Sequence, residues 1–187
     1  MRKLVTTAAL LAPAAAFFGS LYATYRLVFY SPNDRQNDDH AIAHTSQMDV
    51  FREQIIEMID AADAVPYEPV EIRSHDGLVL RARYYHQSDD APLMLCFHGY
   101  RGTPRRDFSG GIQIMLRAGH NILMAEQRAH CGSEGHTITF GVEERYDCLD
   151  WIRWAQGRFG EDKPIFLVDE QRYEKIVLGF VDRVRGE

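Results

Sequence analysis

The residues best placed for chemistry form a short glycine-containing loop after an apolar run. Residues 92–97 are apolar and have the length of a strand, and the sequence His-Gly-Tyr-Arg-Gly follows at 98–102. Backbone N–H groups in a loop that leaves a strand end can be directed at an oxyanion. Glycine removes the side chain that would keep a carbonyl group away from such a loop. The segment therefore predicts a site that binds a carbonyl oxygen or its anion.

No nucleophile accompanies this loop in the expected place. A later apolar run, 164–168, leads into 169–173, which contains neither glycine nor serine, and residues 169–187 contain no Ser, Thr, Cys or His. Ser133 follows a different strand and lacks a glycine two residues before it, and Ser109 lies in an expected helix. Nucleophilic catalysis needs an activated side chain beside a base. We expect neither serine to act as one.

A thiol or metal site is the other chemical interpretation of the middle of the chain. His130, Cys131 and His136 lie in one segment, but neither a fourth ligand nor a C-x-x-C spacing accompanies them. The three cysteines of the chain are not spaced as a ligand set or a disulfide framework. A surface loop is the better interpretation, and we predict no metal and no cofactor. Glu126 and Arg128 are expected to form a structural ion pair at a strand end.

The elements that must position the loop alternate between strands and helices. Asp76-Gly77 between two alternating apolar segments predicts a hairpin. Apolar periodicity then predicts further strands and helices in alternation, which is typical of an α/β fold with a mainly parallel sheet. The expected elements are strands at 70–73, 78–84, 92–97, 121–125 and 165–168, and helices from Ser46, at 107–118, at 142–159 and at 170–185. In the helix at 142–159, Val142, Tyr146, Leu149 and Ile152 share one face.

Residues 66–168 resemble the N-terminal half of an α/β-hydrolase. The resemblance rests on the Asp76-Gly77 hairpin, on the loop at 98–102, and on an acidic-x-Arg-x-x-Gly-x-Ser pattern carried by Glu126, Arg128 and Ser133. Cys131 stands where that pattern has glycine. The N-terminal hydrophobic segment is also typical of membrane-anchored bacterial serine hydrolases. The nucleophile elbow and the later triad region of the family have no counterpart here.

The resemblance implies a fold, a lineage and a partial site. The fold would be an incomplete α/β-hydrolase with a five-stranded sheet in the order 1-2-4-3-5. The lineage hydrolyses ester or acyl bonds through a serine. The backbone of Tyr100, Gly99 and Gly102 would form the oxyanion hole, with His98 in a supporting role. Without a triad we expect this chain to be inactive or a fragment. The alternative is a non-catalytic, membrane-associated binding module, and a small acyl or ester compound is the expected ligand.

The N-terminus predicts a membrane anchor. A stretch without charge runs from Leu4 to Tyr25, after Arg2-Lys3 and before Arg26, and aromatic residues gather at its far end. Such a stretch is long enough to cross a bilayer as a helix. Ala14-Ala15-Ala16 leaves a cleaved signal peptide as the alternative. Either interpretation places the rest of the chain outside the cytoplasm. The expected organisation is an anchor at 1–30, a linker with an amphipathic helix at 31–65, and the truncated domain at 66–187.

Charge and edge strands limit the partners that the chain can have. A formal net charge of −6 over 187 residues argues against a nucleic-acid binder, which would carry a basic surface. If the sheet ends at 165–168, that apolar strand exposes unpaired backbone groups on one side. We therefore expect a marginal monomer that self-associates through this strand.

Overall fold

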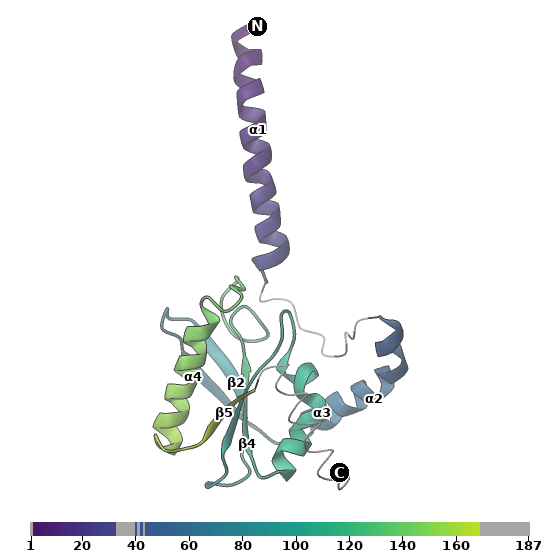
Figure 1. Ribbon diagram of the computed structural model, residues 1–187, viewed down its shortest axis with the longest axis vertical. Helices are drawn as coiled ribbons and strands as arrows, with labels where there is room; N and C mark the ends of the chain where they lie inside the picture. Colours follow the sequence, from purple (N-terminus) through teal and green to yellow (C-terminus); the bar gives the residue numbers. More distant parts are fainter. Residues whose placement is uncertain (1, 33–39, 41, 43, 169–187) are drawn as a thin grey trace.

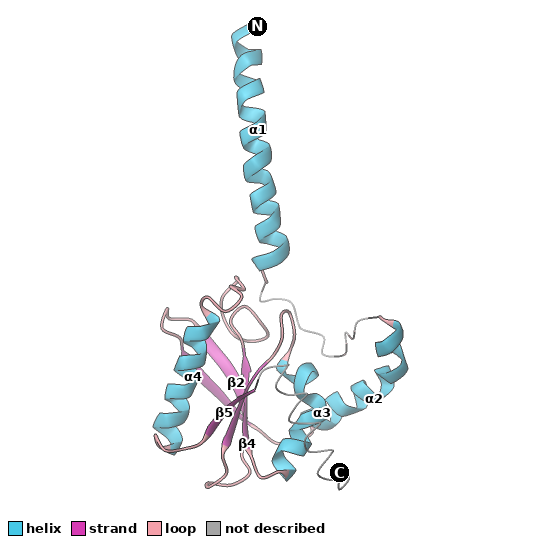
Figure 2. Ribbon diagram, viewed as in Figure 1, coloured by secondary structure: helices cyan, strands magenta, loops and turns pink. Residues whose placement is uncertain are grey.

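The computed structural model describes residues 2–32, 40, 42 and 44–168. One mixed sheet lies between helix α4 on one face and helices α2 and α3 on the other, and helix α1 extends away from this body (Figure 1). Figure 2 shows that the strands converge on loops near the base of α1. The helix expected at 170–185 lies outside the described residues.

The sheet begins with the predicted hairpin. Strands β1, Glu68–Arg73, and β2, Val79–Tyr85, pair antiparallel, and Gly77 in the turn adopts a φ of +93°. Only glycine takes that conformation without strain, since it has no Cβ. The Ser74 hydroxyl accepts the Leu78 N–H at 2.9 Å and closes the turn. The Asp-Gly signal is confirmed.

The remaining strands are parallel and bring two loops to one edge. Strands β3, Leu93–Phe97, β4, Asn121–Glu126, and β5, Ile165–Val168, follow, and the order is β1-β2-β4-β3-β5. The predicted order is confirmed. Strand β3 pairs in parallel with both β4 and β5, with Phe97 opposite Ala125. Because parallel strands end at the same edge, the chain leaves β3 and β4 side by side.

The two faces of the sheet bury alternate residues of each strand. Met94 and Cys96 of β3 pack with the apolar side of α3, and Leu93 and Leu95 pack toward α4. The helices are α2, Ser46–Asp63, α3, Pro104–Arg117, and α4, Glu144–Phe159. Helix α2 begins at Ser46 as predicted, and Thr45 caps it, since its hydroxyl accepts the Met48 N–H at 3.1 Å. Helix α3 begins three residues before the predicted start because Thr103 caps it in the same way.

The face shared by Val142, Tyr146, Leu149 and Ile152 is turned to the core only in part, since Ile152 packs against the buried cluster beside α4. Leu149 and Tyr146 are exposed, whereas Asp147 and Trp151 are buried. The reason is a buried ion pair: the Arg128 guanidinium donates to both carboxylate oxygens of Asp147 at 2.7 Å and fixes which side of the helix faces inward. The apolar stripe was read from periodicity, but a charged side chain orients the helix.

The N-terminal helix forms where the uncharged stretch predicts it, as α1, Arg2–Thr24. Its turns from Pro13 to Thr24 are exposed. Within the described part of the chain, no helix combines the length and the apolar character that crossing a membrane requires. The transmembrane part of the predicted fold is therefore not supported. A π-helical turn, Tyr25–Phe29, follows α1 and leads to the domain.

Candidate functional site

Three backbone N–H groups of the loop after β3 donate to partners within the domain. Gly99 N–H donates to Asp107 Oδ2 at 2.9 Å, and Gly102 N–H donates to the Gly99 carbonyl at 2.9 Å. Arg101 N–H donates to His130 Nε2 at 3.2 Å. Tyr100 N–H has no hydrogen-bond partner among the described residues. In this loop, the amide of Tyr100 is therefore the donor left for a ligand.

Gly99 and Gly102, two of the predicted donors, have internal roles instead. Their N–H groups shape the loop, and a Cβ at Gly102 would overlap the Asp107 carboxylate. Asp107 lies in the first turn of α3, so the helix start and the loop are built around one carboxylate. Glycine is required at 102 by this close approach. The N–H groups of Gly99 and Gly102 are thus occupied within the loop, whereas that of Tyr100 has no partner in the described part of the chain.

His98 is buried and holds the loop against the end of β4. Its Nδ1–H donates to the Gly99 carbonyl at 2.9 Å, and its Nε2 accepts Gln127 N–H at 3.2 Å. Burial, with the nearby His130, lowers the pKa of His98 to about 3. The ring is neutral at physiological pH and both nitrogens are engaged. In this arrangement His98 supports the loop and is not available as a base.

His130 repeats the same arrangement from the neighbouring loop. Its Nδ1–H donates to the Arg128 carbonyl at 2.9 Å, while its Nε2 accepts Arg101 N–H. The two imidazole rings meet edge to face, with centroids 4.7 Å apart. Burial lowers the pKa of His130 as well. The two neutral histidines therefore connect the loops after β3 and β4 to each other.

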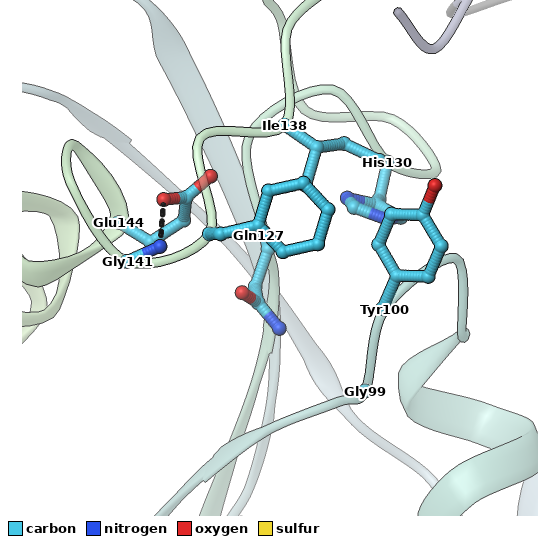
Figure 3. A pocket seen from close by; sticks show the side chains of 8 residues that line it. Gly99, Tyr100, Gln127, His130, Ile138, Gly141 and Glu144 are labelled. Atoms are coloured by element: carbon cyan, nitrogen blue, oxygen red, sulfur yellow. Dashed lines mark hydrogen bonds between the residues drawn. The ribbon is translucent and has the colours of Figure 1, made fainter. Parts of the chain in front are cut away.

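A pocket of about 270 Å³ opens at these two loops. Aromatic and aliphatic side chains form much of its wall, and Figure 3 shows the labelled side chains arranged around it. None of the lining residues is a serine, a threonine or a cysteine. The lining residues are Gly99, Tyr100, Gln127, His130, Ile138, Phe140, Gly141 and Glu144. The pocket can thus accept an apolar group beside Tyr100, and its lining holds no serine, threonine or cysteine that could attack an acyl carbon there.

Glu144 is the charged group of this pocket, and it is tied to the adjacent loop. Its carboxylate accepts Thr139 N–H and Gly141 N–H at 2.7 Å each, and the Thr139 hydroxyl at 2.5 Å. Burial opposes ionisation, but these hydrogen bonds outweigh it and lower the pKa of Glu144. An ionised carboxylate with three internal donors is a loop anchor. It is not poised as a general acid.

The serine of the family pattern is structural. Ser133 is fully buried, its hydroxyl donates to the Glu126 carbonyl at 2.6 Å, and its oxygen accepts Arg81 N–H at 2.8 Å. Cys131 adopts a φ of +49°, the left-handed conformation that glycine favours, so the turn is kept although the residue differs. The loop after β4 therefore keeps the backbone conformation of the family pattern at Cys131, although the residue there is not glycine.

The predicted ion pair of Glu126 with Arg128 is wrong. Arg128 instead donates to Asp147 and to Asp76 in the hairpin turn, with Arg128 Nη1 3.0 Å from Asp76 Oδ2. The hydrogen bonds that Arg128 donates to the Asp147 carboxylate raise the pKa of Arg128, so its charge is permanent. Glu126 accepts Gly132 N–H at 2.8 Å. Arg128 therefore joins the hairpin, the loop after β4 and α4.

Sequence reasoning missed one cluster of possible metal ligands. Among the described residues, His75 can be grouped with Asp76 and Glu143, or with Asp147 and Asp150. Asp76 and Asp147 already accept hydrogen bonds from Arg128. A fixed guanidinium charge between these carboxylates opposes a cation there. The cluster fits an ion-pair network better than a metal centre.

Sequence reasoning also missed the far wall of the pocket. Gln127, Ile138, Phe140 and Glu144 follow β4 in a segment without a repeated spacing. The useful signal was positional: in a parallel sheet, loops after neighbouring strands meet at one edge. Applied to the strands at 92–97 and 121–125, that rule points to the segment after Glu126.

Comparison with solved structures places this architecture among known folds. The esterase Pf2001 of Pyrococcus furiosus matches with a TM-score of 0.50 and 22% identity, over 69% of this chain and 47% of the esterase. DcsB, solved with its substrate analogue, matches with a TM-score of 0.51 and 17% identity, over 56% of this chain and 36% of DcsB. The α/β-hydrolase GrgF of Penicillium sp. sh18 is less similar, with a TM-score of 0.45 and 17% identity over 56% of this chain and 36% of GrgF.

The likenesses to Pf2001 and to DcsB show the fold. The chain resembles part of an α/β-hydrolase, and it spans less than half the length of the structures it matches. No family model matches the sequence, and no curated protein matches it.

Proposed function

We propose that this chain carries the acyl-binding part of an α/β-hydrolase-type site without the group that attacks the acyl carbon. The Tyr100 amide donates to a carbonyl or carboxylate oxygen, and the apolar wall receives the acyl chain. The single observation that carries this proposal is that Tyr100 lines the pocket while its N–H has no partner among the described residues. Preorganised backbone donors of this kind are how acyl-transfer sites hold an oxyanion.

The chemistry of the wall supports binding without hydrolysis. Ile138 and Phe140 contribute apolar surface, and the ring of Tyr100 stacks on Phe140 with centroids 5.1 Å apart. His130 has both nitrogens engaged, and the Glu144 carboxylate accepts three hydrogen bonds from its own loop, so neither is free to act as a base. The lineage implied by the fold hydrolyses ester or acyl bonds, and the printed name of the Pyrococcus protein is esterase. The present chain binds the same chemical class and leaves it unchanged.

Hexanoate is a suitable probe, because its carboxylate resembles an oxyanion and its chain is apolar. The full chain labelled with ¹⁵N-tyrosine gives nine tyrosine amide signals at most, and the Tyr100→Phe variant identifies that of Tyr100. We expect hexanoate to move the Tyr100 amide proton downfield with millimolar affinity, since one donor and a short chain bind weakly. The same titration with 1-hexanol, which lacks the carboxylate, should move it far less. If the chemical shift of the Tyr100 amide proton does not change at the highest hexanoate concentration, the proposal is refuted.

The other proposed partner is a second copy of the chain, held through strand β5. This strand pairs with β3 on one side, and the side chains of Phe166 and Leu167 are exposed. An apolar strand with free backbone groups favours pairing with another strand. If the chain acts as an interaction module, the strand at 165–168 is the surface through which we expect it to self-associate.

Location outside the cytoplasm is proposed from the sequence. The charges of Arg2 and Lys3 before the uncharged stretch would keep the N-terminus inside and direct the domain outward, whether the segment is retained as an anchor or cleaved. A fusion of alkaline phosphatase after residue 187 in a bacterial host tests this, since the enzyme is active only outside the cytoplasm. An inactive fusion protein, expressed at normal levels, contradicts the proposal.

A further inference from the structure

We propose that the segment Tyr25–Ser31, here called the strap, is a working part of the candidate site, and that Arg101 is the positioning residue that ties it to the Tyr100 amide. The inference rests on the proposed function, because it concerns how that amide is aimed. The strap lies about seventy residues before the loop at 98–102 in the chain. None of the predicted site residues belongs to it.

The strap pairs with the loop that forms one wall of the pocket. Tyr30 forms an antiparallel bridge with Thr137, and Ile138 N–H donates to the Phe29 carbonyl at 2.8 Å. Ser31 N–H donates to the His136 carbonyl at 2.9 Å. Because Ile138 lines the pocket, the strap fixes that wall through its own backbone.

The strap also holds the loop that carries the free amide. The Tyr100 hydroxyl donates to the Val28 carbonyl at 2.7 Å. Arg101 Nη2 donates to the Leu27 carbonyl at 2.7 Å and to the Tyr30 carbonyl at 3.4 Å. Residues on both sides of the Tyr100–Arg101 peptide bond are thus attached to one segment. The strap joins the two loops between which the pocket opens.

An aromatic contact closes the same connection. The Phe140 ring contacts two other rings. It stacks on Tyr100, and it meets Phe29 of the strap edge to face with centroids 5.5 Å apart. Phe140 lines the pocket. Movement of the strap therefore acts on the pocket wall through side chains as well as through the backbone.

Arg101 is built for this connection. It adopts a left-handed φ of +54°, and its N–H is held by His130 Nε2. Its neighbours Arg105 and Arg106 pair with the carboxylates of Asp63 and Asp107. Among the described residues no carboxylate pairs with Arg101, and its guanidinium donates to strap carbonyls. Charge-assisted hydrogen bonds of this kind are stronger than neutral ones.

The consequence is that the direction of the Tyr100 amide depends on the strap. The N–H groups on either side, of Gly99 and Arg101, are fixed by Asp107 and by His130. The guanidinium then anchors this short turn to the base of α1. Loss of the anchor should loosen the turn and the wall at Ile138 together.

The test compares two variants of the full chain. Arg101→Gln removes the guanidinium and keeps the backbone, and Arg105→Gln is the matched control, because Arg105 pairs with Asp63 on α2. We expect Arg101→Gln to weaken hexanoate binding about tenfold and to reduce the downfield shift of the Tyr100 amide, as loss of a hydrogen bond to a charged group predicts. Arg105→Gln should bind hexanoate as the unaltered chain does.

Hydrogen exchange separates this inference from the proposed function. Peptides covering 25–31 and 136–141 should both exchange faster in Arg101→Gln, with no ligand present, and peptides of β3 and β4 should not. Thr137→Val, which removes the partner of the Tyr25 hydroxyl, should produce the same pattern more weakly. Failure of the unaltered chain to bind hexanoate would overturn the proposed function. Unchanged exchange in both peptides, or unchanged hexanoate affinity in Arg101→Gln, overturns the role of the strap.

Discussion

At the scale of single residues, the site depends on two histidines that are kept neutral. His98 and His130 each donate through Nδ1–H to a carbonyl and accept a backbone N–H at Nε2. Protonation would convert each acceptor into a donor and break the bond to the loop. The loop that carries the Tyr100 amide is therefore stable only while these rings stay uncharged.

This neutrality predicts a pH dependence of stability. The pKa of His98 is lowered to about 3 in the folded chain, while an exposed histidine has a pKa of about 6.5. Between these values the unfolded chain binds the proton and the folded chain does not, so the free energy of unfolding falls as pH falls. One such group contributes about 1.4 kcal/mol per pH unit below about pH 6.5.

Urea unfolding of the unaltered chain and of His98→Gln at pH 7 and pH 5 measures this contribution. The loss of stability between the two pH values should be smaller in His98→Gln. His44→Gln, at a side chain that is 83% exposed, should leave the loss unchanged. Equal losses in the unaltered chain and in His98→Gln would show that His98 titrates normally.

The identity of the free donor could be predicted only in part from the sequence. The loop at 98–102 and the Tyr100 amide followed from a motif, but Gly99 and Gly102 were also expected to donate. Their partners, Asp107 and the Gly99 carbonyl, depend on where α3 starts and on how the loop closes. Those are three-dimensional facts that a spacing rule does not contain. The strap was missed for the same reason, since it acts mainly through backbone carbonyls.

At the scale of elements, strands were predicted better than helix orientations. The hairpin and the strand at 165–168 were located correctly, because alternation and the Asp-Gly turn are local signals. The apolar face of α4 marks its inner side only in part, because Asp147 is buried there in a pair with Arg128, which is 19 residues away. A long-range ion pair leaves no periodic pattern.

The junction of the loop with α3 gives a prediction at this scale. Gly102→Ala would place a Cβ against the Asp107 carboxylate and the Gly99 carbonyl, so we expect a loss of about 1–3 kcal/mol in the free energy of unfolding. Gly157→Ala is the matched control, because a Cβ there meets no atom within 4 Å and α4 continues through it. It should raise stability by about 0.5–1 kcal/mol. Urea denaturation measures both, and a neutral Gly102→Ala would contradict the close packing.

At the scale of the whole molecule, the sheet ends at a strand that is partly uncovered in the described part of the chain. Phe166 is 51% exposed on β5, and the sheet order puts this strand at an edge. The fold class and the strand order could be predicted, since they follow from the alternation of strands and helices together with the family resemblance. The oligomeric state could not, because it depends on surfaces.

Sedimentation of the full chain over a range of concentrations tests the edge. We expect dimers or larger species that dissociate on dilution, and Phe166→Lys should shift the equilibrium toward monomer, as charges on edge strands do. Val50→Lys, at an exposed apolar side chain on α2, should have no such effect. A monomer at every concentration would show that the strand at 165–168 does not mediate self-association.

The central claim is that a cradle for an acyl group exists here without an attacking group. Intact-mass measurement of the full chain after prolonged incubation with a fluorophosphonate, which phosphonylates activated serines, tests it most directly. We expect an unmodified mass under conditions in which hexanoate shifts the Tyr100 amide. One phosphonyl adduct per chain, mapped to any serine of this sequence, would contradict it.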